Sequence, residues 1–202
     1  MSDDELIIRP MVEGDLDAAV RIFRLAFGTF FRVPDPATFR ADVDFITPRW
    51  KTDPKAAFAA ESAGLVIGSV IGTSWGSQFV IGPLTVDPAQ WGRGVARELM
   101  GRLMALAAER AARLTVLYTM SSSATHLRLY ESFGLAPFML TAVLTKAADT
   151  AAPGAAAFWR FSKLPGEARP QTLDQCRAIT DAVYPGLDLN REIAAVTAFG
   201  FG

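Results

Sequence analysis

Three apolar, β-branched runs that follow one another with only short turns between them constrain the fold of this chain most. The runs span residues 56–61, 64–72 and 79–86. Because such short connections leave no room for a crossover helix, the runs predict an antiparallel three-stranded meander. Gly82-Pro83 interrupts the third run. Proline donates no ladder hydrogen bond and glycine permits a bulge, so we expect the sheet to loosen at this point.

Helical periods lie on both sides of the meander. Apolar residues share one face from Asp15 onward, and Gly28 is the expected end of this first helix. A second amphipathic pattern spans residues 94–113. The remaining expected elements are strands at residues 6–8, 114–120 and 138–146 and short helices near 37–46 and at 125–133. This order predicts an α/β protein of the mixed α+β kind, with a mostly antiparallel central sheet flanked by helices.

Composition excludes several classes of protein. Half of the 202 residues are hydrophobic and 20% are charged, which is enough to bury a core and unlike a disordered chain. A net charge of -1 gives no general basic field, so we expect no nucleic-acid partner. One cysteine and one histidine exclude a disulfide framework and a Cys/His zinc site, and we expect no metal. No apolar run reaches the ~20 residues of a membrane span and the start MSDDEL is acidic, so a cytoplasmic protein is expected.

The stretch that indicates chemistry joins the third run of the meander to the long helix. Gly92 and Gly94 let the backbone approach a ligand closely and leave several N–H groups unpaired at the helix start. Those donors, the helix dipole and the charges of Arg93 and Arg97 favour an anion, and a phosphate-bearing ligand is the natural occupant. A plain strand–helix turn stays open as the alternative, because short glycine motifs are common.

Two familiar phosphate-binding motifs do not fit this stretch. A Walker A loop needs a Lys-Ser/Thr pair, which the sequence lacks here. The dinucleotide fingerprint needs a third glycine within a parallel βαβ unit, whereas the preceding runs predict a meander. A nucleotide-binding protein is therefore disfavoured.

Residues 92–96, Gly-Arg-Gly-Val-Ala, open the long helix after a Val-Asp-Pro strand end. They resemble the acyl-CoA pyrophosphate loop of the GNAT N-acetyltransferases, whose usual form is Gln/Arg-x-x-Gly-x-Gly/Ala. Here Trp91 occupies the first position, Gly94 the fourth and Ala96 the sixth. The tryptophan is a departure from the family, although Gln90 lies one residue before it.

A second segment strengthens the resemblance. Residues 126–135 are similar to the family's Ala-x-x-Leu-Tyr-x-x-x-Gly-Phe segment, with Tyr130 and Gly134 in their places and Leu135 replacing the phenylalanine. Ser123 stands where an asparagine is frequent in the family. The resemblance covers about residues 5 to 147 and implies a GNAT-like sheet.

The resemblance also implies that acetyl-CoA is the cosubstrate and that an amine of an acceptor molecule is acetylated. In the family, the bulged strand splays from its neighbour and the pantetheine arm lies in the V-shaped slot between them. The residues that the resemblance assigns to the cofactor are Leu84, Thr85, Val86, Trp91, Gly92, Arg93, Gly94, Val95, Ala96, Arg97 and Ser123. Among them, the backbone N–H groups of residues 84–86 are expected to polarise the thioester carbonyl.

Tyr130 and Glu61 are the candidate catalytic residues. In the resemblance, the Tyr130 phenol acts as the acid that protonates the departing thiolate. The alternative is a half-buried tyrosine that packs on the last strand. The strand before the loop has no carboxylate to act as base, so Glu61 on an earlier strand is expected to act through water, unless solvent suffices. Cys176 lies outside this region, so direct transfer is preferred to an acyl-enzyme.

The chain is expected to divide into a GNAT-like unit at residues 1–147, an Ala-rich linker at 148–157 and a C-terminal extension or partial second GNAT-like unit at 158–202. The elements expected in the extension are a strand at 158–162 and helices at 174–182 and 190–199. Its large apolar side chains are Phe158, Trp159, Phe161, Leu173 and Ile179. These need cover from the first unit or from a second chain, and a homodimer is the expected state.

Two functions remain open at the level of the sequence. The first is an acetyl-CoA-dependent N-acetyltransferase. The second is a non-catalytic acyl-CoA-binding or interaction module that keeps the loop without turnover. The identity of the acceptor amine cannot be predicted from these residues.

Overall fold

The computed structural model describes residues 5–142, 144 and 160–199. Its centre is one five-stranded sheet, built from β1 (Ile7–Pro10), β2 (Ala57–Ser62), β3 (Leu65–Trp75), β4 (Gln78–Val86) and β5 (Leu114–Leu117). The strands lie side by side in chain order; the first four are antiparallel to their neighbours, and β5 is parallel to β4. The expected mixed fold with a mostly antiparallel sheet is confirmed.

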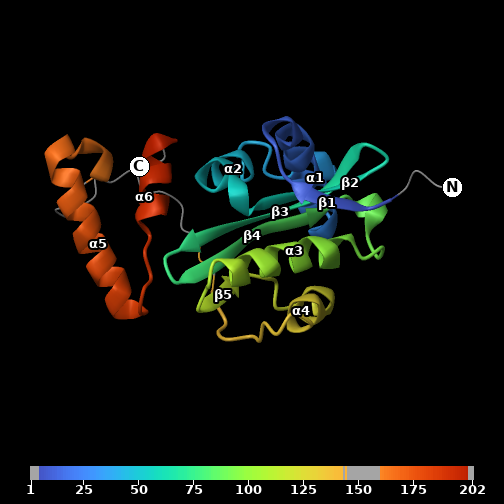
Figure 1. The fold of residues 1–202 in the computed structure, drawn as a ribbon. Helices are drawn as coiled ribbons and strands as arrows, with labels where there is room; N and C mark the ends of the chain where they lie inside the picture. The colour runs from blue at the N-terminus through green and yellow to red at the C-terminus, as the bar shows by residue number, and fades with distance from the viewer. Residues whose placement is uncertain (1–4, 143, 145–159, 200–202) are drawn as a thin grey trace.

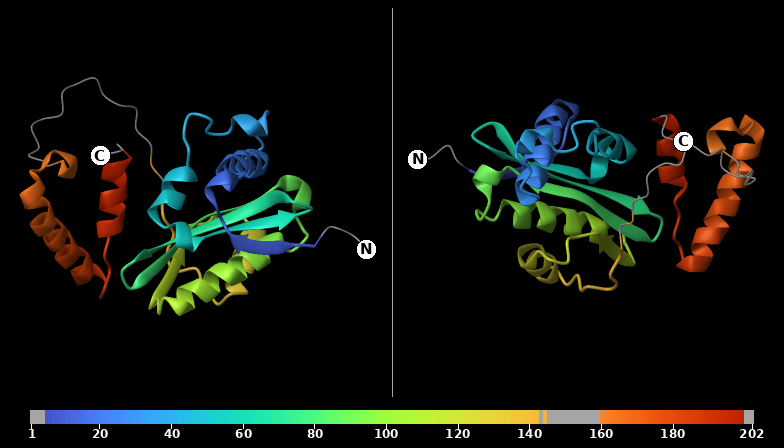
Figure 2. Two further views of the ribbon diagram at one scale, coloured as in Figure 1. Left: turned by 45° about the horizontal axis from the view of Figure 1, so that its top comes forward. Right: turned by 180° about the vertical axis from the view of Figure 1, so that it is seen from behind.

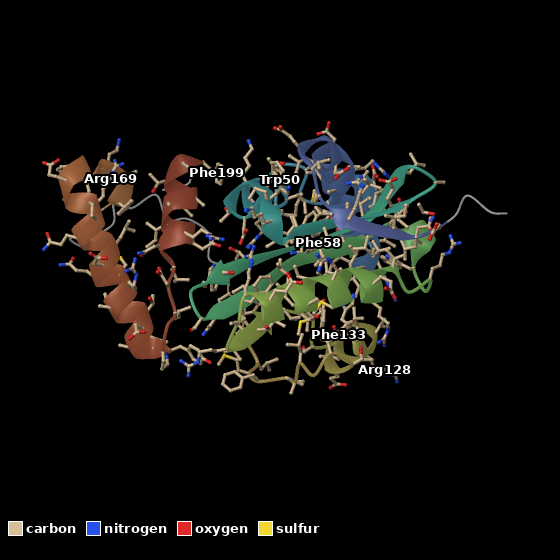
Figure 3. All side chains as sticks on the ribbon, viewed as in Figure 1. Trp50, Phe58, Arg128, Phe133, Arg169 and Phe199 are labelled. Atoms are coloured by element: carbon tan, nitrogen blue, oxygen red, sulfur yellow. The ribbon has the colours of Figure 1, made fainter. Side chains whose placement is uncertain are left out.

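Helices cover both faces of the sheet (Figure 1). Helices α1 (Leu16–Phe30) and α2 (Thr47–Thr52) lie on one face, and α3 (Val95–Glu109) and α4 (Ala124–Glu131) lie on the other. The apolar stripe of α3 includes Leu99 and Leu103, which are fully buried, and full burial of one such side chain contributes about 1.5–3 kcal/mol. Phe58 of β2 and Phe133 after α4 belong to the core on this face (Figure 3).

A bulge interrupts the pairing of β4 with β3 at the expected place. Val70 pairs with Leu84 but Gly72 pairs with Ile81, so Gly82-Pro83 on β4 together oppose a single residue of β3. The parallel pairing of β4 with β5 covers only residues 78–81 and ends where the bulge begins. The prediction that the sheet loosens near Gly82 is therefore confirmed.

Some expected element bounds were wrong. Helix α1 continues through Gly28 to Phe30, and the helix expected near 37–46 is replaced by a 3-10 turn, Pro36–Thr38, and by α2. Pro48 lies in the first turn of α2, a position that tolerates proline because it needs no N–H donor. Residues 138–142 and 144 form no strand, and the rest of the expected strand at 138–146 lies outside the described residues.

The C-terminal extension lies beside the end of the β3–β4 hairpin (Figures 1 and 2). Its elements are two 3-10 turns, Phe161–Lys163 and Gly166–Ala168, and the helices α5 (Arg169–Val183) and α6 (Asn190–Ala198). The strand expected at 158–162 is absent from its described part, residues 160–162. The linker at 148–157 lies outside the described residues. Ile179 stays 68% exposed, so the first unit covers only part of the apolar set, and the homodimer stays a prediction.

Backbone hydrogen bonds attach the extension to the hairpin. The Ser77 N–H donates to the Gly186 carbonyl at 2.7 Å, and the Asp188 N–H donates to the Trp75 carbonyl at 3.3 Å. Gly76 forms a β-bridge with Leu187. The extension therefore adds a short antiparallel contact to the hairpin turn.

An ion-pair network reinforces the attachment. Asp53, which is 5% exposed, accepts hydrogen bonds from both Arg110, which directly follows α3, and Arg191 of α6. The indole N–H of Trp75 donates to the Glu192 carboxylate at 2.8 Å. The Arg191–Asp53 and Trp75–Glu192 contacts join residues that are 138 and 117 positions apart in the sequence and hold α6 against the first unit.

Candidate functional site

The pairing of β4 with β5 stops at the bulge, and we call the unpaired edge of β4 beyond it the slot. The four residues of β5 pair with residues 78–81 of β4, and among the described residues none pairs with 83–86 on that side. The Asp87 N–H donates to Ile67 of β3 at 2.9 Å, so strand alternation directs the Thr85 N–H toward β3 as well. The N–H groups of Leu84 and Val86 then face the slot, where they can bind an acceptor oxygen.

The loop after β4 presents a group of unpaired amides. Gly92 and Gly94 have φ values of 78° and 84°, the left-handed region that other residues adopt only with strain. Along α3, the first N–H to find a carbonyl is that of Arg97, which donates to Gly94 at 2.9 Å. Among the described residues, the amides of 92–96 have no partner within the chain. Unpaired amides at a helix N-terminus form a site for a phosphate group.

Side chains around the loop have separate roles. Val95 is 4% exposed and anchors the first turn of α3 in the core, whereas Arg97 is exposed and its guanidinium lies 5.8 Å from the Phe133 ring. The Arg93 guanidinium donates to the Gln90 side chain. Both arginines therefore put positive charge at the start of α3, as the sequence predicts.

Trp91 connects the loop to β4. Its indole N–H donates to the Val86 carbonyl at 2.8 Å, while 45% of the residue stays exposed. The N–H and C=O of one strand residue point to the same side, so the Val86 carbonyl also faces the slot. The indole N–H therefore satisfies the Val86 carbonyl and holds the loop against the end of β4. Trp91 thus has a structural role at the position where the sequence departs from the usual motif.

Tyr130 lies in α4, half-buried against the core that packs on α3. Burial raises the pKa of its phenol above the usual 10.0, and a hydrogen bond with the Thr119 side chain lowers that pKa by less. Thr119 lies two residues after the end of β5. This contact therefore places the Tyr130 hydroxyl just beyond the end of β5. A phenol that stays protonated at neutral pH at this place can donate a proton.

The start of α4 is fixed by local contacts. The Ser123 hydroxyl accepts a hydrogen bond from the His126 N–H at 3.4 Å and caps the helix. The His126 ring lies between Phe30 of α1 and Tyr130, with centroids 5.3 Å and 6.5 Å away. Burial lowers the pKa of His126, so its imidazole is neutral at pH 7. His126 is thus a packing residue that joins α1 to α4.

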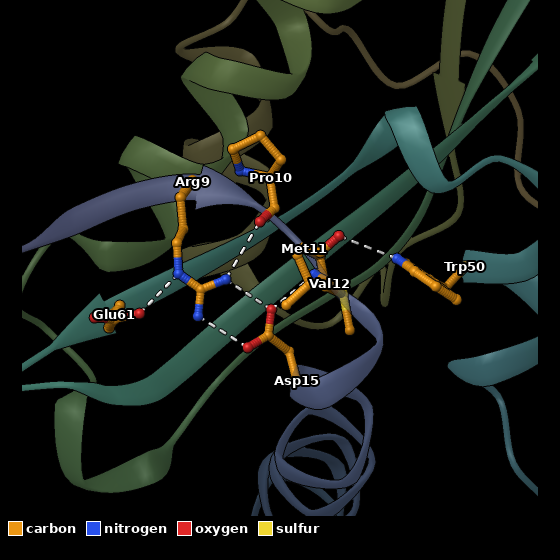
Figure 4. Close-up of polar contacts among 7 residues, drawn as sticks. All are labelled: Arg9, Pro10, Met11, Val12, Asp15, Trp50 and Glu61. Atoms are coloured by element: carbon orange, nitrogen blue, oxygen red, sulfur yellow. Dashed lines mark hydrogen bonds and ion pairs between the residues drawn. The ribbon is translucent and has the colours of Figure 1, made fainter.

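Glu61 pairs with Arg9, and the structure does not bring it to the slot; Figure 4 shows the ion pair. Glu61 lies on β2, which β3 separates from β4, and its carboxylate accepts a hydrogen bond from Arg9 at 2.7 Å. The same guanidinium donates two bonds to Asp15, at 2.7 and 2.8 Å. Sequence alternation alone could not identify this partner, because Arg9 is 52 residues away. Glu61 therefore belongs to an ion-pair network at the start of α1.

We expect Asp15→Asn to lower the free energy of unfolding by about 1–3 kcal/mol at pH 7, because the buried pair with Arg9 loses its charge. The hydrogen bonds from Arg9 depress the pKa of Asp15 below 3.8, so this stabilisation is present above that value and is lost as the pH falls through the depressed pKa. Urea unfolding between pH 7 and 2.5 measures the difference. The exposed Asp17→Asn is the matched control; an Asp15→Asn variant that keeps the wild-type pH dependence contradicts the assignment.

A second feature, which the sequence did not reveal, lies on the other side of the bulge. Gly82 also lines a small recess on the α2 face of the sheet, together with Arg49 and Thr73. Glu192 of α6 also lines this recess. The strand pattern gave no signal for Glu192, because its position depends on contacts more than 100 residues apart.

Two properties of the described residues bear on the kind of site. Residues 5–142, 144 and 160–199 contain no group of three or more His, Cys, Asp or Glu side chains placed to hold a metal ion. In the same part of the chain, each helix is too short or too polar to cross a membrane.

Comparison with known proteins agrees with this geometry. The sequence matches the Acetyltransferase (GNAT) family over residues 17–135. A search of proteins with curated function gave no match.

Solved structures with the same fold include the ribosomal-protein-S18-alanine N-acetyltransferase from Escherichia coli, with a TM-score of 0.50 and 22% identity over 64% of this chain and 77% of that one. Another is the aminoglycoside N-acetyltransferase AAC(6')-Iy in complex with CoA, with a TM-score of 0.50 and 15% identity over 72% and 97%. A proposed acetyltransferase from Pyrococcus horikoshii has a TM-score of 0.60 and 17% identity over 96% and 62%. At these identities the likeness shows the fold. Because the family match spans more than half of the chain, the protein belongs to the GNAT acetyltransferase family.

Proposed function

We propose that the protein transfers the acetyl group of acetyl-CoA to an amine by direct attack on the thioester. The observation that supports this most is the row of unpaired amides at residues 92–96, which fits a pyrophosphate, next to a slot that β4 and β5 leave open. A structural neighbour that binds CoA has the same fold.

Each residue of the slot has a role in this proposal. Of the two N–H groups that face the slot, those of Leu84 and Val86, one donates to the thioester carbonyl oxygen as negative charge develops on it, because the two lie about 6–7 Å apart along the strand and cannot both reach one oxygen. The neutral amine attacks the carbonyl carbon, a C–N bond forms and the C–S bond breaks. Tyr130 donates its phenolic proton to the departing thiolate, and the amine releases one proton to solvent.

Acetyl-CoA is expected to raise the melting temperature of the protein, because a ligand of the native state stabilises it. At an acetyl-CoA concentration of 100 times its dissociation constant, the free energy of unfolding rises by about 2.7 kcal/mol. For a chain of this size that raises the melting temperature by about 5–10 °C. We expect Gly94→Val to abolish the shift, since its side chain occupies the space where a phosphate approaches the backbone. Differential scanning fluorimetry with acetyl-CoA measures this.

Gly64→Val is the matched control for that experiment. Gly64 has a φ of 74° and, like Gly94, has open space where a Cβ would lie, but it belongs to the β2–β3 turn. The control therefore carries the same backbone strain and is expected to keep the ligand shift. An unchanged shift in Gly94→Val refutes the loop assignment. A full shift without thiol release from acetyl-CoA, over a panel of amines, favours the non-catalytic binding module.

A further inference from the structure

Trp91 lies where the two parts of the proposed cofactor site meet. Its backbone directly precedes the amides of residues 92–96, and its indole N–H donates to the Val86 carbonyl of β4 at 2.8 Å. Within the described residues Val86 has no strand partner on its slot side, yet only 7% of it is exposed. The indole therefore lies against the edge of β4, between the slot and the loop.

This edge of β4 offers few carbonyl oxygens to a ligand. Alternation turns the main-chain groups of Thr85 toward β3, which leaves those of Leu84 and Val86 on the slot side. Trp91 uses the second of these two carbonyls, the one nearer to the loop. A ligand that runs from the loop along β4 reaches this carbonyl first.

Acetyl-CoA presents matching groups to the edge. The arm that links its pyrophosphate to the thioester contains two amides, and each amide carries one N–H donor and one C=O acceptor. An extended chain of amides beside an unpaired strand edge forms the hydrogen bonds of an added strand. With the pyrophosphate at residues 92–96, the arm must pass Trp91 and Val86 as it enters the slot.

We propose that the Trp91 indole competes with an amide N–H of this arm for the Val86 carbonyl, so that Trp91 weakens the binding of the arm and leaves the binding of the nucleotide unchanged. The proposal rests on the proposed cofactor site. Since 45% of Trp91 is exposed, its ring can turn outward without opening the core. After acetyl transfer the indole re-forms its bond to Val86 as CoA leaves, which favours release of the product.

A purely structural Trp91 would have the opposite effect. If its hydrogen bond only holds the loop in place, loss of that bond loosens the amides of residues 92–96 and weakens the binding of every ligand that carries the pyrophosphate. If the indole competes with the arm, loss of the bond tightens the binding of ligands that have the arm and leaves the others unchanged. The direction of the change therefore distinguishes the two roles.

The test uses Trp91→Phe in the full chain, because phenylalanine keeps an aromatic ring and removes the N–H donor. Trp50→Phe is the matched control, since the Trp50 indole also donates to a main-chain carbonyl, that of Met11 at 3.3 Å, but lies in α2 away from the slot. Two ligands are titrated into each protein by calorimetry. They are CoA and 3′-phospho-ADP, the nucleotide part of CoA without the arm.

We expect Trp91→Phe to bind CoA about 2- to 10-fold more tightly than the wild type, the effect of one net hydrogen bond, and to release it more slowly. Its affinity for 3′-phospho-ADP is expected to stay the same, and Trp50→Phe should bind both ligands as the wild type does. Unchanged CoA affinity in Trp91→Phe means that the carbonyl accepts both donors, and weaker affinity means that Trp91 only holds the loop. Either result overturns the proposal, and so does an equal gain for both ligands.

The indole N–H signal of Trp91 in NMR spectra, identified by its loss in Trp91→Phe, gives a second readout. Its hydrogen exchange with solvent is expected to accelerate when CoA binds, because the Val86 carbonyl passes to the ligand, and to change little with 3′-phospho-ADP. An exchange rate that CoA leaves unchanged contradicts the competition.

These outcomes are distinct from failure of the proposed function. A wild-type protein that binds neither CoA nor 3′-phospho-ADP refutes the cofactor site, and the role of Trp91 with it. CoA binding without thiol release refutes acetyl transfer alone, and the comparison of the variants then decides the role of Trp91 as before.

Discussion

Tyr130→Phe is expected to lower kcat about 10²–10⁴-fold, the usual loss when a positioned general acid is removed. The variant keeps the ring that packs against the core, and it removes only the hydroxyl near Thr119. Without a proton donor the thiolate leaves as a free anion, which raises the barrier of the step that breaks the C–S bond. Steady-state thiol release with a saturating amine measures kcat.

Acetyl-CoA affinity is expected to change little in Tyr130→Phe, since the proposed phosphate site consists of the loop amides and not of Tyr130. Tyr184→Phe, in the C-terminal extension, is the matched control and should keep wild-type turnover. Because burial raises the pKa of Tyr130 above 10.0, its phenol stays protonated through the neutral range. A Tyr130→Phe enzyme with wild-type kcat shows that this tyrosine only packs.

Gly76→Ala is expected to detach residues 184–199 from the first unit. A Cβ on Gly76 would lie 2.0 Å from the Gly186 carbonyl oxygen, and its φ of 63° adds strain for any other residue. The contacts at risk are three hydrogen bonds of this turn, including the Ser77 N–H to Gly186. At about 0.5–1.5 kcal/mol each, their loss raises the population of the detached state about 10- to 2,000-fold.

Limited proteolysis and amide hydrogen exchange of residues 184–199 measure that opening. Gly64→Ala has a similar φ with open space around the new methyl group, so it controls for backbone strain. The acetyl-CoA shift is expected to remain in both variants, because the loop at 92–96 lies elsewhere. Equal exchange rates in the two variants would mean that the attachment does not depend on this close approach.

The sequence predicted the elements whose signals are local. The meander, the bulge at Gly82-Pro83 and the glycine loop that opens α3 each follow from residues within a few positions of one another. The loop and Tyr130 were identified through the family resemblance, which rests on two short motifs. Such features need no knowledge of the rest of the chain.

The parts that sequence reasoning missed depend on distant contacts. Glu61 turns to Arg9 because a guanidinium already held by Asp15 attracts it, which strand alternation cannot reveal. Trp91 was assigned to the cofactor, yet its indole also holds the Val86 carbonyl. Glu192 reaches the recess only because the extension packs on the hairpin, a contact that no local pattern encodes.

The attachment of residues 186–192 to the β3–β4 hairpin links the conformation of the hairpin turn to the docking of α6. By thermodynamic linkage, whatever stabilises the docked conformation of the turn must tighten the docking of α6 by the same factor by which docking stabilises the turn. Anything that competes for the hairpin turn then releases α6. The cofactor loop, which shares none of these contacts, would continue to bind its ligand with the helix released.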